Sequence, residues 1–258
     1  MFIESDANPK VQQLQGLLHS RKKRKESDVF VLESPKVIRE YLEKRPQDIV
    51  AIICAESDVF THEKIPVWVM KNSVFDRLAS TVSPQKLMAL CHKPAWKMKP
   101  VVTGASRFFL LDGVRDPHNL GAVLRNMKAF GVDVLLLSED CVDVFHPKVC
   151  RAAAGAVLSI PCFVITDETV PLLNQLGARF SMITAKGEQS IGEISHFERQ
   201  VFIFGSEGQG VSDQLVSDIS QLTSIHHYSI EMASDLESLN ISVASGIVAQ
   251  HLFQKQKS

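Results

Sequence analysis

Four polar residues in the C-terminal half of the chain stand where a folded protein could use them for chemistry. The first two are Asn119, just before a helical apolar pattern over 120–130, and Arg125, six positions later. Arg125 has small neighbours, such as Gly121 and Ala122, which leave room for another surface to approach. A guanidinium in such a place can stabilise a developing negative charge. The alternative, that Asn119 only caps the helix and Arg125 is a solvated charge, stays open.

A glycine-rich segment holds the third residue, Glu207. The run FGSEGQGVS over 204–212 follows an apolar run of strand length. Glycines allow positive φ angles and the close approach of backbone to a ligand. The spacing of Gly205, Gly208 and Gly210 fits neither the G-x-G-x-x-G dinucleotide motif nor the P-loop. Glu207 could cap the following helix or order the loop around a bound substrate.

The fourth residue, Asn240, lies near the start of the last helical stretch. Ser238 is a suitable N-cap, and we expect Leu239, Val243 and Ile247 to form the buried stripe of that helix. Asparagine is a poor helix former in a first turn, so we expect Asn240 to make a specific hydrogen bond. Spacing alone leaves open whether that bond is structural or catalytic.

The elements that must position these residues follow an alternating pattern. From residue 107 onward, helical stretches separate five apolar runs of strand length, at 108–111, 134–137, 162–165, 180–184 and 201–204. Continuous apolar strands with helices between them predict an α/β fold with a parallel sheet covered on both faces. In such sheets ligands bind at the carboxyl ends of the strands.

The preceding part of the chain predicts a smaller α/β unit over residues 1–92. It contains helical patterns and strand-like runs, at 11–18, 29–32, 37–42, 49–54 and 67–70. Residues 93–105 contain Pro94 and Pro100 and show little periodicity, which is typical of a linker. We therefore expect one domain over 1–92 and a second over 106–258.

Composition argues against several classes of protein. A formal net charge of −1 over 258 residues does not suit a histone-like nucleic-acid binder. Five cysteines without C-x-x-C spacing do not suit a disulfide framework or a structural zinc site. Nine histidines show no metal-ligand or triad pattern, so we expect no metal. The first residues lack a secretory pattern and no apolar stretch approaches the roughly 20 residues of a membrane span, so we expect a cytoplasmic protein without a membrane partner.

Taken together, in this order and spacing, the three segments resemble the motifs of the SpoU (TrmH-like) family of RNA ribose 2′-O-methyltransferases, over about residues 105–255. The first ninety residues resemble the L30e-like RNA-binding domain of longer members, on a basic run and on VFVLESPKVIREYL. The matching positions are Asn119 and Arg125 in motif 1, Gly205, Glu207, Gly210 and Ser212 in motif 2, and Ser238, Leu239, Asn240 and Ser242 in motif 3.

The resemblance implies a SPOUT fold, in which a deep trefoil knot forms the cofactor pocket. It also implies a homodimer with the site at or near the subunit interface, and S-adenosylmethionine as the cofactor. Glu231 stands where the family usually has proline, which affects the wall of that pocket. The residues expected to contact the cofactor are Thr184, Ala185, Gly187, Gly205, Ile230 and Leu239.

The same resemblance implies roles for the four polar residues. We assign to Arg125 the stabilisation of the oxygen of the attacking ribose, because a guanidinium resists deprotonation and is a poor general base. Asn119 and Asn240 would position Arg125 and the ribose, and Glu207 would hold the loop or the arginine. The uninterrupted basic run would contact RNA phosphates, through Arg21, Lys22, Lys23, Arg24 and Lys25.

Three other functions stay open. A nicotinamide-dependent enzyme needs its glycine-rich turn after the first strand, whereas the turn here comes late. A transfer RNA could be the substrate, although the extra N-terminal domain favours 23S-type ribosomal RNA by analogy. A non-catalytic RNA-binding factor on the same fold would not require the intact set of Asn119, Arg125, Glu207 and Asn240.

Overall fold

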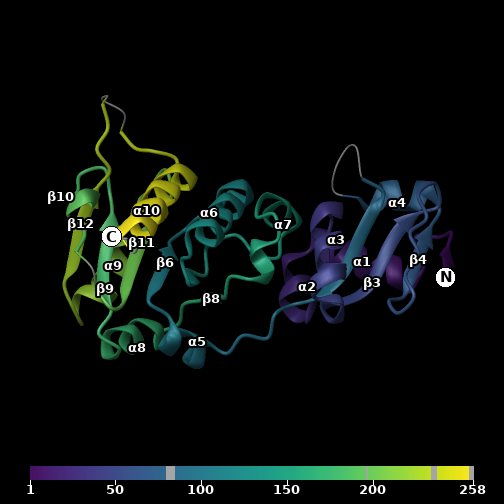
Figure 1. Cartoon of the computed structure of the whole chain (residues 1–258), viewed down its shortest axis with the longest axis horizontal. Helices are drawn as coiled ribbons and strands as arrows, with labels where there is room; N and C mark the ends of the chain where they lie inside the picture. Colours follow the sequence, from purple (N-terminus) through teal and green to yellow (C-terminus); the bar gives the residue numbers. More distant parts are fainter. Residues whose placement is uncertain (80–84, 196, 234–236, 256–258) are drawn as a thin grey trace. The chain divides into compact units, whose positions relative to one another are not determined.

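The structure, a computed structural model, describes residues 1–79, 85–195, 197–233 and 237–255 and divides into two compact units (Figure 1). The first unit contains Met1–Pro94 and Phe145–Gly155, and the second contains Ala95–Val144 and Ala156–Ser258. These units differ from the expected domains in two places, because Phe145–Gly155 groups with the first unit and the expected linker over 93–105 is divided between the two units. Within the expected linker, Met98–Gly104 forms a helix, α5.

The first unit is built on a five-stranded sheet with the order β1-β4-β3-β5-β2. Its first three strands run parallel to one another, and β5 runs antiparallel to both β3 and β2. The strands are β1 (Phe2–Ile3), β2 (Val29–Leu32), β3 (Ile49–Ala55), β4 (Val67–Met70) and β5 (Leu87–His92). The helices are α1 (Pro9–His19), α2 (Arg21–Glu26), α3 (Pro35–Lys44), the 3-10 turn η1 (Pro46–Asp48), α4 (Asn72–Leu78) and α7 (Pro147–Ala152).

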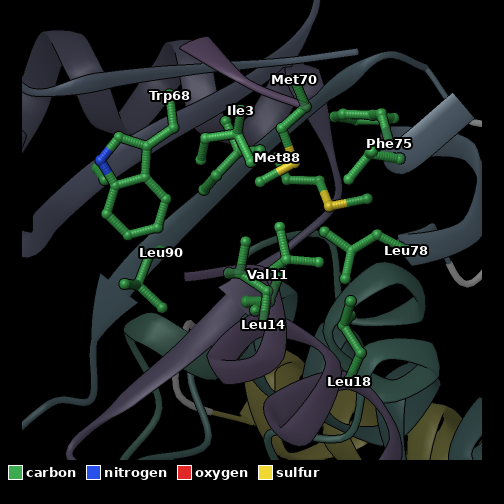
Figure 2. Packing of buried hydrophobic residues seen from close by; sticks show 14 of the residues in the cluster. Ile3, Val11, Leu14, Leu18, Trp68, Met70, Phe75, Leu78, Met88 and Leu90 are labelled. Atoms are coloured by element: carbon green, nitrogen blue, oxygen red, sulfur yellow. The ribbon is translucent and has the colours of Figure 1, made fainter. Parts of the chain in front are cut away.

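A single apolar cluster joins α1 and α4 to one face of this sheet (Figure 2). Val11, Leu14 and Leu18 recur at helical spacing on α1 and are buried. Met88 and Leu90 alternate along β5 and enter the same cluster. The helical spacing of apolar residues in α1 and their alternation in β5 therefore place them in the same core.

The basic run forms a short helix, and one of its five cations is buried. Ser20 begins α2 by accepting a hydrogen bond from the Lys23 amide at 3.3 Å. Arg24 is only 3% exposed, and its Nη1 atom donates to the carbonyls of Leu17 (2.9 Å) and Leu18 (3.2 Å) at the end of α1. The expectation that Arg24 contacts RNA phosphates is therefore wrong, because its guanidinium satisfies orphan carbonyls of a helix C-terminus.

The segment Phe145–Gly155 packs on β2 and α3 of the first unit. The rings of Phe145 and Phe30 lie 4.8 Å apart between centroids. Arg151 donates to the Glu33 carboxylate at 2.5 Å, and the Glu33 side chain is only 6% exposed. A Cβ added to Gly155, which has a φ of +84°, would lie 3.0 Å from Val37. These contacts explain why the segment belongs to the first unit.

The second unit is built on a seven-stranded sheet with the order β10-β12-β9-β11-β6-β7-β8, and every pairing in it is parallel. This confirms the expected α/β fold with a parallel sheet. The strands are β6 (Arg107–Leu111), β7 (Val134–Leu137), β8 (Cys162–Val164), β9 (Arg179–Ile183), β10 (Gln189–Ser190), β11 (Gln200–Phe204) and β12 (Ile225–Ser229). The helices, besides α5, are α6 (Pro117–Phe130), η2 (Ala156–Leu158), α8 (Thr169–Gln175), η3 (Ile191–Glu193), α9 (Asp213–Ser220) and α10 (Ile241–Lys255).

Helices α6 and α10 pack against each other (Figure 1), and a side-chain hydrogen bond joins them. The Asn126 amide donates to the carbonyl of Ser242 at 2.8 Å. A Cβ added to Gly246 would lie 3.0 Å from the same amide, so the absence of a side chain there permits the close approach. The start of α10 is thereby fixed against the middle of α6.

Within the described ranges, none of the helices combines the length and apolar character that crossing a membrane requires. The same ranges contain no group of three or more His, Cys, Asp or Glu residues arranged to hold a metal ion.

Candidate functional site

Three of the four candidate residues, Asn119, Glu207 and Asn240, belong to loops and helix starts that follow the carboxyl ends of β6, β11 and β12. Strand β6 leads into α6 with Asn119, and β11 leads into the glycine-rich loop with Glu207. Because β6 and β11 are neighbours in the sheet, residues 88 positions apart in the chain meet at one edge. The segment after β12 returns to this edge with Asn240 at the start of α10.

Asn119, Glu207 and Asn240 form a hydrogen-bonded cluster. Glu207 Oε1 accepts from Asn119 Nδ2 at 2.8 Å and from Asn240 Nδ2 at 2.5 Å. Asn240 Nδ2 also donates to Asn119 Oδ1 at 3.1 Å. Hydrogen bonds to a carboxylate are stronger than those between neutral groups, so the cluster holds three separate chain segments together.

The orientation of the Asn240 side-chain amide follows from the hydrogen bonds that its oxygen, Oδ1, accepts. Asn240 Oδ1 accepts from the Ser242 amide at 2.8 Å and from the Ser242 hydroxyl at 2.5 Å, as an N-cap does. Its NH₂ group must then face Glu207. The specific hydrogen bond expected for Asn240 is present, but the residue precedes α10 rather than lying in its first turn, and Ser238 is not at the cap.

Asp116, not Asn119, is the N-cap of α6. The Asp116 carboxylate accepts from the His118 amide at 2.7 Å, and Pro117 is the first helical residue. The capping alternative for Asn119 is therefore wrong, since its side chain is committed to Glu207 and Asn240.

The glycine-rich loop folds tightly back on itself and presents Glu207. The backbones of Ser206 and Gly210 exchange two hydrogen bonds of 3.0 Å. A Cβ on Gly205 would lie 2.0 Å from the carbonyl carbon of Gly210, so only glycine fits there, whereas Gly208 has open space. Asp112 anchors the end of the loop by accepting from the Ser212 amide at 2.7 Å. Asp112 was not among the predicted site residues, although a carboxylate directly after a strand is a detectable signal.

A pocket of about 520 Å³ lies between the loops that follow β9, β11 and β12. Five of the six residues expected to contact a cofactor line it: Thr184, Ala185, Gly205, Ile230 and Leu239. The sixth, Gly187, is not in the lining, but a Cβ there would lie 2.2 Å from the Tyr228 backbone. Gly187 therefore lets the loop after β9 close against the end of β12. Met232 lines the pocket beside Ile230, whereas Glu231 between them does not.

A second pocket, of about 290 Å³, adjoins the first. Asn119 lines the second pocket, while Leu239 lines only the first. The two pockets share wall residues in the glycine-rich loop and at the start of α10, namely Ser206, Glu207, Gln209, Gly210 and Ile241. Glu207 thus stands between two adjacent cavities.

Arg125 is not part of the cluster. Six helical residues correspond to about 9 Å of rise and about 240° of rotation, so Asn119 and Arg125 face different directions on α6. Arg125 is exposed, lines neither pocket, and makes no hydrogen bond or ion pair with another described residue.

The buried face of α10 also differs from the expected stripe. Val243 is 48% exposed, and Leu239 lies before the helix begins. The buried residues of α10 are Ile241, Ala244, Ser245, Val248, Ala249 and Leu252.

Comparison with known proteins gives consistent matches over both units. Residues 106–250 match the family described as the SpoU rRNA Methylase family, and residues 8–89 match the MRM3-like substrate binding domain. The chain is 30% identical over 258 residues to the 23S rRNA (guanosine(2553)-2′-O)-methyltransferase RlmP of Bacillus subtilis (strain 168), covering 97% of this chain and 98% of that protein. It is 31% identical over 156 residues to the 23S rRNA (guanosine-2′-O-)-methyltransferase RlmB of Nitrosomonas europaea, covering 60% and 58%.

Solved structures share the fold. A putative RNA methyltransferase of the TrmH family from Porphyromonas gingivalis superposes with a TM-score of 0.80 at 27% identity, covering 96% of this chain and 98% of that one. The AdoMet-bound rRNA methyltransferase from Sinorhizobium meliloti gives a TM-score of 0.83 at 21% identity, covering 100% and 99%.

Proposed function

The chain belongs to the SpoU rRNA methylase family, and we propose that it transfers a methyl group from S-adenosylmethionine to a ribose 2′-hydroxyl of ribosomal RNA. The observation that carries this proposal is the cluster of Asn119, Glu207 and Asn240, which stands between two adjoining pockets. One pocket can hold the methyl donor and the other the acceptor nucleotide. The two relatives named above act on 23S ribosomal RNA, which favours that substrate here.

The larger pocket fits S-adenosylmethionine in size and lining. Its volume of about 520 Å³ falls within the range of small-ligand sites, roughly 300–1,000 Å³. Apolar side chains from Ile230 and Leu239 suit an adenine ring, and the close packing at Gly205 exposes backbone groups for polar contacts. When bound, S-adenosylmethionine supplies a methyl group already activated by its sulfonium, so the protein needs no metal for this reaction.

The protein's own residues would then align the acceptor. A ribose hydroxyl is a poor nucleophile, and most of the acceleration can come from holding it in line with the methyl group. The Asn119 amide and the Glu207 carboxylate face the smaller pocket and can orient the ribose there. Asn240 would fix both, because its amide contacts each of them.

Arg125 keeps its proposed role as the cation that stabilises the attacking oxygen or the adjacent phosphate. It is exposed and apart from the cluster within one chain. The role therefore requires bound RNA or a second copy of the chain to bring Arg125 to the site. The proposed homodimer supplies the latter, and the exposed Val243 on α10 suits a buried position in it. We also propose that the second unit contains the trefoil knot that the family resemblance implies.

The first unit is proposed to bind the RNA. Its match to the MRM3-like substrate binding domain supports this role. Four of the five cations in the basic run, Arg21, Lys22, Lys23 and Lys25, are exposed on α2 and can meet phosphates.

The deciding experiment supplies the purified protein with S-adenosylmethionine carrying a labelled methyl group. Ribosomal and transfer RNA from cells lacking the gene serve as separate substrates, and nucleoside mass spectrometry identifies the product. A 2′-O-methylated nucleoside in ribosomal RNA is the expected result. Product in transfer RNA alone would move the proposal to that substrate. No product in either RNA would favour a non-catalytic RNA-binding role.

A further inference from the structure

Beyond the residues already assigned, the smaller pocket carries an ion pair on its wall. Arg115 Nη2 lies 3.4 Å from Asp140 Oδ2, and both residues line the pocket together with Asn119 and Glu207. Their side chains are 76% and 73% exposed. An ion pair this exposed contributes little to stability, and both of its charged groups are open to a ligand in the pocket.

The backbone that carries this pair is held in place. The Gly113 amide donates to Ser138 Oγ at 2.9 Å, and the Val142 amide donates to the Val114 carbonyl at 2.9 Å. Cys141 is buried, and burial raises the pKa of its thiol, which donates to the Leu111 carbonyl at 3.3 Å. The loop with Asp140 is therefore joined, on both sides of Asp140, to the two residues that precede Arg115.

Two other carboxylates of the pocket are already used by backbone amides. Asp112 accepts from the Ser212 amide and Asp116 from the His118 amide, each at 2.7 Å. Among the described residues, the Asp140 side chain has a hydrogen bond and an ion pair only with Arg115. Asp140 is thus the wall carboxylate with most capacity to accept from a ligand.

We propose that Arg115 and Asp140 read the base of the target nucleotide and select guanine. This inference rests on the proposed methyl transfer to RNA. Guanine presents an acceptor, O6, beside two donors, N1–H and the N2 amino group, along one edge. A guanidinium beside a carboxylate complements that edge, because Arg115 donates to O6 while Asp140 accepts from both donors.

The other bases fit this pair less well. Uracil has one donor between two acceptors, so one carboxylate oxygen would face an acceptor. Adenine and cytosine each place an acceptor beside their single amino group. A phosphate is disfavoured as well, because the pocket is lined by four carboxylates and a single cation, Arg115, and the carboxylates repel an anion. The four carboxylates are those of Asp112, Asp116, Asp140 and Glu207. With about 290 Å³, the cavity suits one nucleotide turned out of its helix.

The test uses the full chain and a ribosomal RNA transcript. The position that the wild-type protein methylates is first mapped, and the transcript is then rebuilt by ligation with guanosine or inosine there. Inosine lacks only the N2 amino group. We expect the wild-type protein to methylate the guanosine transcript about tenfold faster or more, since a hydrogen bond to a charged group contributes at least a factor of that size.

Asp140→Ala should reduce the preference for guanosine over inosine to about twofold or less, with affinity for S-adenosylmethionine unchanged in calorimetry. The matched control is Glu139→Ala, which removes a carboxylate from the adjacent position outside the pocket lining and should keep the wild-type preference. A preference for guanosine that survives Asp140→Ala would overturn the inference, as would a wild-type protein indifferent to inosine or a target other than guanosine. In each of these cases methyl transfer still occurs, so the proposed function stands. Absence of methylation in every RNA would overturn both.

Discussion

Glu207 Oε1 lies 2.5 Å from Asn240 Nδ2, although the two residues come from a glycine-rich loop and a helix start. The Asn240 amide cannot turn away, because its oxygen caps α10 through the Ser242 amide. The start of α10 therefore fixes the direction in which Asn240 Nδ2 donates to the Glu207 carboxylate.

Removing this carboxylate should slow methyl transfer in a graded way. Glu207→Gln keeps an oxygen acceptor but loses the charge, and we expect a loss of several-fold because charge-assisted bonds are about twice as strong as neutral ones. Glu207→Ala removes the acceptor and should lower the rate by about 10- to 100-fold. Single-turnover kinetics measure both, with Glu188→Gln on the neighbouring loop as the control. Equal rates for all three variants would remove Glu207 from the reaction.

Arg125→Ala should lose methyl transfer while keeping affinity for S-adenosylmethionine. The side chain is exposed and lines neither pocket, so its removal should leave the cofactor site intact. Calorimetry and a methyl-transfer assay on the same preparation separate the two effects. Lys128→Ala, an exposed cation one turn further along α6, is the matched control. Normal turnover by Arg125→Ala would exclude the residue from catalysis.

Substitutions in α2 should distinguish cations that bind RNA from Arg24, which stabilises the fold. Changing Lys22, Lys23 and Lys25 to glutamine should reduce the slope of log affinity for RNA against log salt by about two to three, since each phosphate contact contributes about 0.7–0.9. Arg24→Met should instead lower the free energy of unfolding by about 1.5–3 kcal/mol, because two carbonyls lose a charged donor. Filter binding over a salt series measures the slope of the triple lysine variant, and urea unfolding measures the stability of Arg24→Met. A triple variant with the wild-type slope would locate RNA binding elsewhere.

Two glycines of one loop should tolerate alanine very differently. Gly205→Ala places a Cβ 2.0 Å from the Gly210 carbonyl carbon, so the loop must open and the affinity for S-adenosylmethionine should fall by at least about tenfold. Gly208→Ala meets nothing within 4 Å and should bind normally. Calorimetry on both variants gives the comparison, and a similar affinity in both would contradict the tight loop.

Stability should decrease on mild acidification, in part through His251. Burial, together with the nearby Lys255, lowers the pKa of His251 in the folded protein. Below about pH 6.5 the unfolded chain then binds a proton that the folded state does not, so the free energy of unfolding falls as the pH falls. His251→Leu should flatten this dependence between pH 7.5 and 5.5 in urea unfolding, with exposed His92→Leu as the control. An unchanged slope in His251→Leu would contradict the assignment.

Much of the second unit could be predicted because its central strands are apolar without interruption. β6, β7 and β11 read directly as buried strands, whereas β12 has His226 and His227 in its middle and gave no apolar run. The six-residue helix α2 was also hidden, since a run of cations carries no periodicity.

The site was predictable as a set of residues but not as an arrangement. The cluster depends on β6 and β11 being adjacent in the sheet, and strand order is a long-range property that local patterns do not contain. Asn119 was open to interpretation as a cap because the pattern did not show that α6 begins two residues earlier, at Pro117. The Arg115–Asp140 pair joins loops 25 positions apart and left no local signal.

The packing of Phe145–Gly155 on the first unit affects how the protein is made. A ribosome that has completed Pro94 must still synthesise residues 95–144 before this segment exists. At about 5–20 residues per second, that interval lasts several seconds. During it, the surface around Phe30 and Val37 that the segment later covers is open to water. The nascent N-terminal part is therefore incomplete while the strands of the second unit begin to emerge.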